Sequence, residues 1–314
     1  MTKPNLFIVG QPKSGTSALY TMLQDHPEIC MCEEKEPSIF ARDFMEQSIA
    51  FHGRNIFCHC TAIEEYLKLF PVKDEKIVGE GSTHYLYSQA AAQAIHEFNP
   101  AARIIMMLRE PITFMHSLHA ENLAEAREDV VDFARAVALE ESRLRGENIP
   151  PLARCPAYHI YKARALDYRR QIERFVAVFP KEQIRLIIFE DFRGKNEEYL
   201  REIFRFLGVD ENYTPQVREI NKNKTVRFRG LYHLIQSPDL KKGMRTLLGT
   251  KLYFSIKKGV DKVFFRTEKR APIPPDLQAA LKTEFTPMVR DLNTYLHEQG
   301  LTDIDLVKIW GYDV

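Results

Sequence analysis

The sequence predicts an α/β fold in which helices cover both faces of a central, mostly parallel β-sheet. Short apolar runs alternate with longer amphipathic stretches along most of the 314 residues, and this alternation is typical of strands joined by crossover helices. The chain is also long enough, and at 45% hydrophobic residues apolar enough, to bury a large core. We therefore expect a single domain that spans residues 1–314.

Four strand–helix pairs account for most of the predicted sheet. Each strand is a short apolar run, and each helix repeats apolar residues at helical spacing. Parallel strands need right-handed crossovers, and their ligands bind at the carboxyl ends of the strands. The expected pairs are strand 5–10 with helix 16–26, strand 76–80 with helix 88–98, strand 103–108 with helix 112–126, and strand 184–190 with helix 197–209.

Three further segments do not follow this alternation. Residues 30–75 are rich in charged, histidine and aromatic residues without a sustained period, so we expect loops and short helices over the sheet edge. Residues 221–275 form a basic loop and helix segment, and the stretch 241–270 holds ten basic and two acidic residues. Residues 276–314, which follow a pair of prolines, are expected to form a closing helix.

Composition argues against several classes of protein. With 44 Lys and Arg against 43 Asp and Glu, the chain is not expected to bind nucleic acid in general. It contains no apolar run of membrane-spanning length and begins directly with a strand, so we expect a cytoplasmic protein. Five cysteines, with close pairs at Cys30/Cys32 and Cys58/Cys60, favour reduced thiols. A metal site that uses His59 is the alternative.

The stretch GQPKSGTSAL follows the first strand and has the spacing of a phosphate-binding loop. Gly10 and Gly15 are separated as in a Walker loop, but the lysine comes before the second glycine and not after it. Backbone N–H groups and the N-terminus of a helix attract an anion in such a loop, although a plain strand–helix turn is the alternative. The predicted anion ligands are Pro12, Lys13, Ser14, Gly15, Thr16 and Ser17.

A second anion site is predicted after strand 103–108. Arg109 stands at the end of that strand, and Ser117 follows in the next helix. A guanidinium fork matches phosphate oxygens, although an ion pair to Glu110 or Glu190 would also explain this arginine. Two such sites on one sheet suggest a nucleotide that carries anions at both its 5′ and 3′ positions.

The stretches PKSGTSAL, LREPITFMHS, IRLIIFEDF and LREIFRFLGV together resemble the PAPS-dependent sulfotransferases, in particular the bacterial and glycosaminoglycan-type branch. The resemblance implies a P-loop-like three-layer sandwich, the donor 3′-phosphoadenosine 5′-phosphosulfate (PAPS), the product PAP and no metal. It also assigns the 5′-phosphosulfate to the first motif and the 3′-phosphate to Arg109 and Ser117. A sulfuryl group carries one negative charge where a terminal phosphoryl group carries about two, so a lysine can replace magnesium.

Three candidates compete to accept the proton from the acceptor. The stretch EEKEPSIF resembles the family segment in which a glutamate is the general base, which assigns that role to Glu36 and places Lys35 beside the donor. His84 is the second candidate, by analogy with the cytosolic branch of the family. Glu80 is the third, and we expect it instead to orient Lys13 or Lys35.

The acceptor side of the site is less defined by sequence. Ser82 and Tyr85 lie in a stretch that resembles the glycan branch and are expected to line the acceptor cleft together with residues 30–75. Arg227 and Arg229 occupy the position of the family's late basic loop and are expected near the 3′-phosphate. The acceptor itself is a hydroxyl or amine of a small molecule, glycan or lipid.

Residues 241–270 alternate basic and apolar side chains, which fits either peripheral contact with a membrane or a helix packed on the core with a solvated basic face. Two functions of other classes remain as alternatives. One is a P-loop nucleotide kinase, which the absent Walker lysine position disfavours. The other is a non-catalytic protein that binds a nucleotide and a membrane.

Overall fold

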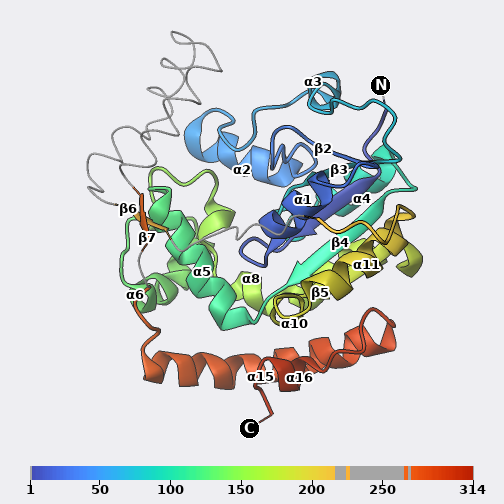
Figure 1. The fold of residues 1–314 in the computed structure, drawn as a ribbon. Coiled ribbons are helices and arrows are strands. Elements are labelled where there is room, and N and C mark those ends of the chain that lie inside the picture. Colours follow the sequence, from blue (N-terminus) through green and yellow to red (C-terminus); the bar gives the residue numbers. More distant parts are fainter. Residues whose placement is uncertain (1, 216–223, 227–264, 268–269, 314) are drawn as a thin grey trace.

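The fold is described by a computed structural model that covers residues 2–215, 224–226, 265–267 and 270–313. Arg227, Arg229 and nearly all of the basic run 241–270 lie outside these described residues, so the predictions made for them are untested. Figure 1 shows the sheet enclosed by helices, with the C-terminal helices crossing below it.

Five parallel strands form the central sheet in the order β2-β3-β1-β4-β5. β1 and β4 are neighbours, but their connections leave in opposite directions, from β1 toward β2 and from β4 toward β5. Such a reversal is where ligands bind in open α/β sheets. The strands are β1 (Leu6–Gly10), β2 (Ile29–Met31), β3 (Ile77–Gly81), β4 (Arg103–Leu108) and β5 (Ile184–Ile188).

Alternation of side chains along the strands creates two hydrophobic cores, one on each face of the sheet. Along β1, Leu6 and Ile8 pack into a core with α1 (Thr16–Gln24) and α11 (Asn196–Leu207). Phe7 and Val9 point to the opposite face, into a larger core. Its helices include α4 (Ala91–Phe98), α5 (Pro111–Ala124), α8 (Lys162–Leu166), α9 (Tyr168–Val176) and α15 (Pro275–Glu298).

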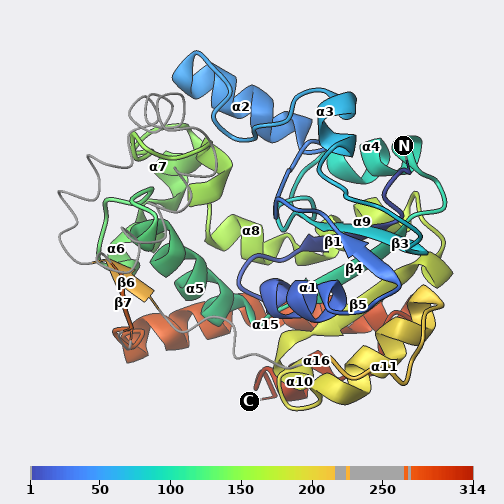
Figure 2. The same cartoon turned by 45° about the horizontal axis from the view of Figure 1, so that its top comes forward.

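Shorter elements complete the described fold. Seen from a second direction in Figure 2, α2 and α3 lie along one rim of the sheet, and α6 and α7 lie beyond α5. These elements are α2 (Arg42–His52), α3 (Ile63–Leu67), α6 (Phe133–Ala138), α7 (Glu140–Leu144), α10 (Phe189–Phe192), α16 (Leu306–Ile309), the 3-10 turns Pro156–His159 and Lys181–Gln183, and the antiparallel pair β6 (Lys224–Val226) and β7 (Phe265–Thr267).

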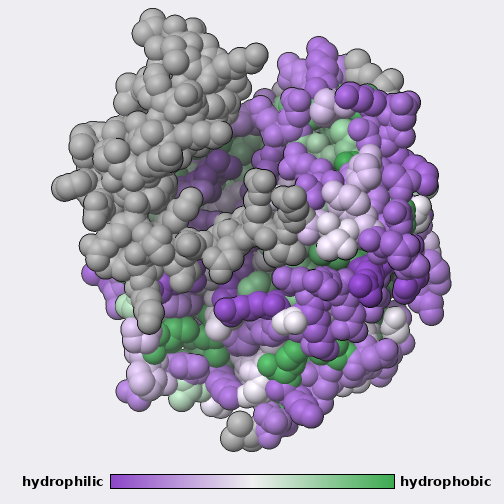
Figure 3. Space-filling model, in the orientation of Figure 1, coloured by the Kyte–Doolittle hydropathy of each residue, from purple (hydrophilic) through white to green (hydrophobic). Residues whose placement is uncertain are grey.

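The predicted fold class is confirmed, and the four predicted strand–helix pairs are present. The sequence did not predict β2, because a three-residue edge strand carries too short a pattern to stand out. The closing helix is present as α15, and it is followed by a turn and by α16. The described part of the surface in Figure 3 is mostly hydrophilic, with apolar residues in small patches.

None of the helices in the described ranges is long and apolar enough to cross a membrane. All five cysteines are buried thiols. Within the same ranges, no group of three or more His, Cys, Asp or Glu side chains is arranged to hold a metal ion.

Candidate active site

The loop between β1 and α1 is shaped by two glycines. Gly10 lies close to the loop that follows β3. A Cβ at this position would lie 2.7 Å from the Thr83 carbonyl oxygen. Gly15 precedes the first turn of α1 with φ of 85°, and a Cβ there would lie 3.0 Å from the Phe189 ring. Only glycine meets both demands, so the loop turns tightly and presents the N-terminus of α1 to the carboxyl edge of the sheet.

Lys13 lies at the tip of this loop in a left-handed backbone conformation, with φ of 65°. Its ammonium group forms an ion pair with Glu121 of α5, at 3.0 Å between Nζ and Oε1. The two side chains are 23% and 34% exposed, so the pair is open to solvent and to a ligand. Glu121 lies one helical turn after Ser117, on the same face of α5.

Arg109 joins the second predicted anion site directly to the loop. Its Nη1 donates to the Lys13 carbonyl oxygen at 2.8 Å, and its Nε donates to Thr113 Oγ1 at 3.2 Å. The guanidinium carbon lies 4.9 Å from the centre of the Phe189 ring. The two predicted anion sites are therefore adjacent, at the ends of the neighbouring strands β1 and β4.

Two hydroxyl groups at these sites are buried and have no hydrogen-bond partner among the described residues. They are Ser14 Oγ in the loop and Ser117 Oγ in α5, in residues that are 0% and 1% exposed. Pro12 and Thr16 are also buried, whereas Ser17 is half-buried at the start of α1. A buried hydroxyl without a partner costs about 1–3 kcal/mol, so both oxygens are free to form a hydrogen bond with a ligand.

Glu36 approaches the same loop from the segment after β2. It also has a left-handed backbone, with φ of 62°, and strained residues of this kind gather at functional sites. Its carboxylate accepts a hydrogen bond from Thr83 Oγ1 at 3.1 Å and lies 3.7 Å from the Lys35 ammonium group. Lys35 in turn donates to Ser17 Oγ, so Glu36 is tied to the start of α1.

Glu80 differs from its expected arrangement. The carboxylate is buried at the end of β3 and accepts hydrogen bonds from Tyr66 and Tyr85 at 2.9 Å and from Ser82 at 2.6 Å. Neither Lys13 nor Lys35 is among these partners. Burial raises the pKa of Glu80 to about 7, although its hydrogen bonds act in the opposite direction.

Ser82 and Tyr85 are consequently not placed as cleft-lining residues. Both are 0% exposed, and their hydroxyl groups point to the Glu80 carboxylate. The backbone N–H of Ser38 also donates to Ser82 Oγ at 3.1 Å, which fixes the segment after Glu36 to β3. The hydrogen bonds among Glu80, Ser82 and Tyr85 therefore help to hold the segment that carries Glu36.

His84 is buried, and its ring is held by an aromatic and a basic residue. Its ring stacks on Tyr158 at a centroid distance of 3.9 Å, and its Nδ1 lies 3.3 Å from Arg164 Nη1. Burial, reinforced by the Arg164 charge, holds the pKa of His84 well below its usual range. Since Arg164 can only donate, Nδ1 serves as the acceptor of that contact.

Sequence reasoning missed four residues of this site: Glu121, Thr83, Thr113 and Phe189. Glu121 carried a usable signal, because its four-residue spacing from Ser117 predicts a shared helix face. Phe189 stands at the end of the predicted fourth strand, where functional side chains are expected. The two threonines lie in loops and helix starts without any distinguishing pattern.

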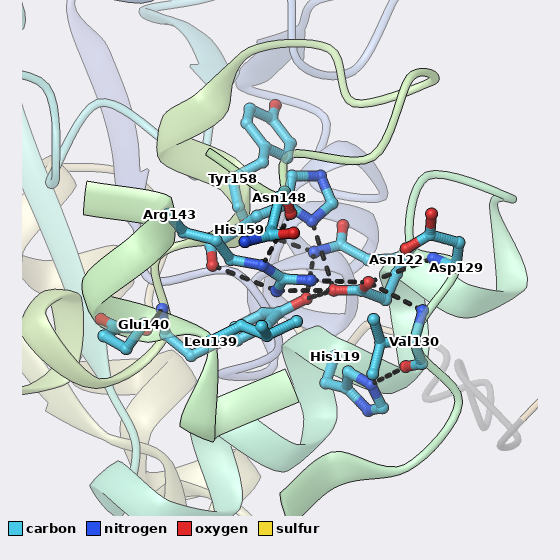
Figure 4. A network of polar contacts seen from close by, with 12 residues as sticks. His119, Asn122, Asp129, Val130, Leu139, Glu140, Arg143, Asn148, Tyr158 and His159 are labelled. Carbon is cyan, nitrogen blue, oxygen red and sulfur yellow. Dashed lines mark hydrogen bonds and ion pairs between the residues drawn. The ribbon is translucent and has the colours of Figure 1, made fainter. Parts of the chain in front are cut away.

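A separate buried network lies beyond the end of α5 (Figure 4). Glu128 and Arg143 form a two-pronged ion pair, at 2.8 and 2.9 Å, and both side chains are 0% exposed. Tyr161 donates to the same carboxylate at 2.8 Å, and the backbone N–H of Val130 donates at 3.0 Å. Burial alone would raise the pKa of Glu128, but hydrogen bonds from His159 and Arg143 outweigh it and hold the pKa well below its usual range.

Comparison with known proteins identifies the family. Residues 4–214 match a family model described as "Sulfotransferase family". Mouse carbohydrate sulfotransferase 15 is 25% identical over 249 residues, which cover 66% of this chain and 44% of that protein. Human bifunctional heparan sulfate N-deacetylase/N-sulfotransferase 3 is 26% identical over 220 residues, covering 67% of this chain and 23% of that protein. The chain belongs to the sulfotransferase family.

A solved structure extends the similarity to the whole chain. The sulfotransferase from Alicyclobacillus acidocaldarius is 26% identical, with a TM-score of 0.71 over 99% of this chain and 100% of that one. The chain spans less than half the length of the curated relatives named above.

Proposed function

We propose that this chain transfers a sulfuryl group from PAPS to a hydroxyl or amine group of an acceptor and releases PAP. When bound, PAPS supplies the activated sulfuryl group. The residues of the chain bind its two anionic ends, neutralise the charge that develops on the leaving oxygen, and remove the acceptor proton.

The observation that carries the proposal is the pair of buried hydroxyls that have no partner among the described residues, Ser14 in the loop after β1 and Ser117 in α5. Arg109, which follows β4, contacts the Lys13 carbonyl oxygen at 2.8 Å. Hydroxyl donors, a guanidinium group and a helix N-terminus form a donor set that suits phosphate and sulfate oxygens. The residues present therefore fit a nucleotide with anionic groups at both the 5′ and the 3′ position.

Lys13 is the group that stabilises the leaving oxygen in this proposal. Its ion pair with Glu121 is partly exposed, and burial raises the pKa of Glu121, which disfavours the charged form of that partner. A donor anion that enters the loop competes easily with that carboxylate for the ammonium group. A fixed positive charge at the leaving oxygen acts most strongly as the bond to sulfur breaks.

Glu36 is the proposed general base. Its carboxylate is 30% exposed and connects through Lys35 to Ser17 at the start of α1, so it faces the loop that holds the transferring group. His84 is the weaker candidate, because it is buried and its ring nitrogen already contacts Arg164. The orientation of Glu36 depends on Thr83, which donates to it at 3.1 Å.

We propose a saccharide as the acceptor class, with residues 30–75 as one wall of the acceptor cleft within a single domain 1–314. Both curated relatives carry a carbohydrate or heparan sulfate acceptor in their names. Cytoplasmic location and membrane contact through residues 241–270 stay predictions from the sequence.

Calorimetry with PAP and transfer from ³⁵S-labelled PAPS test the proposal together. We expect the protein to bind PAP without added metal, and to label a hydroxyl- or amine-bearing saccharide in an extract of its source. Arg109→Ala is expected to weaken PAP about tenfold or more, because a charge-assisted hydrogen-bond donor is lost, and to change adenosine 5′-phosphate binding little. Magnesium-dependent ATP turnover without PAP binding would instead favour the kinase alternative, and PAP binding without transfer would favour a non-catalytic protein.

A further inference from the structure

Two carboxylates, those of Glu110 and Glu190, lie near Arg109, and either would be expected to form an ion pair with its guanidinium group. Glu110 is its neighbour in the chain, and Glu190 lies in α10, directly after β5; both act on its guanidinium electrostatically. An arginine in such surroundings commonly forms a forked ion pair with a carboxylate, which would leave no fork for a phosphate. Among the described residues, however, no carboxylate lies within ion-pair distance of Arg109, which instead contacts Lys13 O and Thr113 Oγ1.

The C-terminal segment explains why the two carboxylates are held elsewhere. Trp310 Nε1 donates to Glu190 Oε2 at 2.8 Å, and Tyr312 Oη donates to Glu110 Oε1 at 2.7 Å. The other oxygens of both carboxylates are taken by backbone donors. The backbone N–H of Glu110 donates to Glu190 Oε1 at 3.1 Å, and the backbone N–H of Thr113 donates to Glu110 Oε2 at 2.7 Å.

Trp310 and Tyr312 are firmly placed by their surroundings. They are 7% and 1% exposed and directly follow α16. In both Figure 1 and Figure 2, α16 lies beside α10, although more than a hundred residues separate the two helices in the chain. Trp310 also packs edge-on against Tyr168, whose hydroxyl donates to the Arg109 carbonyl oxygen at 3.2 Å.

Glu110 has a second role that links this contact to Ser117. Its side chain accepts hydrogen bonds from Ile112 N and Thr113 N and so caps the N-terminus of α5, the helix that carries Ser117. The Tyr312 hydroxyl therefore affects both residues of the second anion site. It contacts Glu110, which is the neighbour of Arg109 and also caps the helix that carries Ser117.

We propose that Trp310 and Tyr312 are positioning residues of the donor site, which hold Glu190 and Glu110 away from Arg109 so that its guanidinium recognises a nucleotide 3′-phosphate. This inference rests on the proposed function and adds the residues that set its nucleotide selectivity. The C-terminal segment lies beyond residues 4–214, the part of the chain that matches the family model.

The test is the selectivity between PAP and adenosine 5′-phosphate, measured by calorimetry on the full chain. The double variant Trp310→Phe with Tyr312→Phe removes the two donors and leaves an aromatic ring, smaller at residue 310, at each position. We expect its affinity for PAP to fall about tenfold, roughly the effect of one charge-assisted hydrogen bond, with little change for adenosine 5′-phosphate. An unchanged ratio of the two affinities would overturn the inference.

Two further variants separate this role from a general loss of structure. Tyr199→Phe is a matched control, because the Tyr199 hydroxyl donates to the nearby carboxylate of Asp191 at 2.8 Å and does not involve Arg109; its selectivity should equal that of the wild type. Adding Glu190→Gln to Trp310→Phe removes the competing charge and should restore PAP selectivity. Failure of that restoration would contradict the proposed charge competition.

The outcomes also distinguish the two levels of the argument. A wild-type protein that binds PAP no better than adenosine 5′-phosphate would refute the proposed function itself. A wild-type protein that prefers PAP, and a double variant that keeps the full preference, would refute only the role of Trp310 and Tyr312.

Discussion

The Glu128–Arg143 ion pair of the buried network and the Ser14 and Ser117 hydroxyls of the site differ in how far their hydrogen bonds are satisfied. In the network, the carboxylate and guanidinium groups are 0% exposed and meet hydrogen-bond partners on several sides. At the site, the Ser14 and Ser117 hydroxyls are buried without a hydrogen-bond partner in the part of the chain that the structure describes. The first arrangement is what a stable fold requires, and the second is what a ligand requires.

Helix α5 contributes residues to both regions, so the effects of substitutions on stability and on function can be compared within one helix. Ser117 and Glu121 lie on α5 at the site, and Asn122, one residue further, donates to Tyr161 Oη of the network at 3.2 Å. Substitutions at the site should therefore change binding or turnover with little effect on unfolding. Substitutions in the network should lower the free energy of unfolding and leave the binding constant of the folded protein unchanged.

The largest effect is expected from Glu36→Gln, which should lower turnover about 10²–10⁴-fold. The amide still accepts a hydrogen bond from Thr83 but takes no proton, so the dissociation constant for PAP should be unchanged. Initial rates with ³⁵S-labelled PAPS measure the loss. Glu33→Gln, an exposed carboxylate in the same segment, is the matched control, and normal turnover of Glu36→Gln would move the base to His84.

Arg143→Met should lower the free energy of unfolding by about 3–5 kcal/mol, because it leaves the Glu128 charge buried without its main partner. Urea denaturation measures this change. Arg145→Met removes an ion pair with Glu147 that is exposed at 61% and 57%, and it should cost less than about 1 kcal/mol. Equal losses of unfolding free energy from the two substitutions would contradict the expectation that the buried ion pair matters more for stability than the exposed one.

Glu80 should make stability depend on pH between the usual carboxyl pKa and a pH of about 7. Its folded-state pKa of about 7 lies above the usual carboxyl value, so the folded protein holds a proton that the unfolded chain has released. The contribution is complete below the usual carboxyl pKa and is lost as the pH rises through 7, by at most about 3 kcal/mol. Subtracting the unfolding free energies of Glu80→Gln from those of the wild type between pH 5 and 8 isolates this term; a flat difference would contradict the assignment.

The smallest effect is expected from Ser117→Ala. Because the hydroxyl has no partner among the described residues, its removal should leave the free energy of unfolding unchanged or raise it by about 1 kcal/mol, and weaken PAP binding about five- to tenfold. Ser48→Ala is the matched control, since that buried hydroxyl accepts from Ile56 N at 3.1 Å. It should lose about 1 kcal/mol of stability and bind PAP normally; the reverse pattern would refute the comparison.

The sequence predicted much of the fold because its strands are short apolar runs and its helices have a clear period. It also predicted that the loop of Lys13 and the residue Arg109 would lie at one edge, since both come after strand ends, with Ser117 in the helix that follows Arg109. It did not predict the partners of Glu80, because tyrosines from two separate segments reach it only in the folded chain. Nor did it predict that His84 would stack on Tyr158, 74 residues further along.

The amino-acid sequence alone determined the α/β architecture, the loop with its displaced lysine and the resemblance to sulfotransferases, because these features depend on local spacing and on the order of strands and helices. Only the tertiary structure decided which carboxylate meets Lys13, which side chains donate to Glu110 and Glu190, and which buried hydroxyls lack a partner among the described residues. These contacts join residues far apart in the chain, and packing, which no local pattern records, determines their geometry.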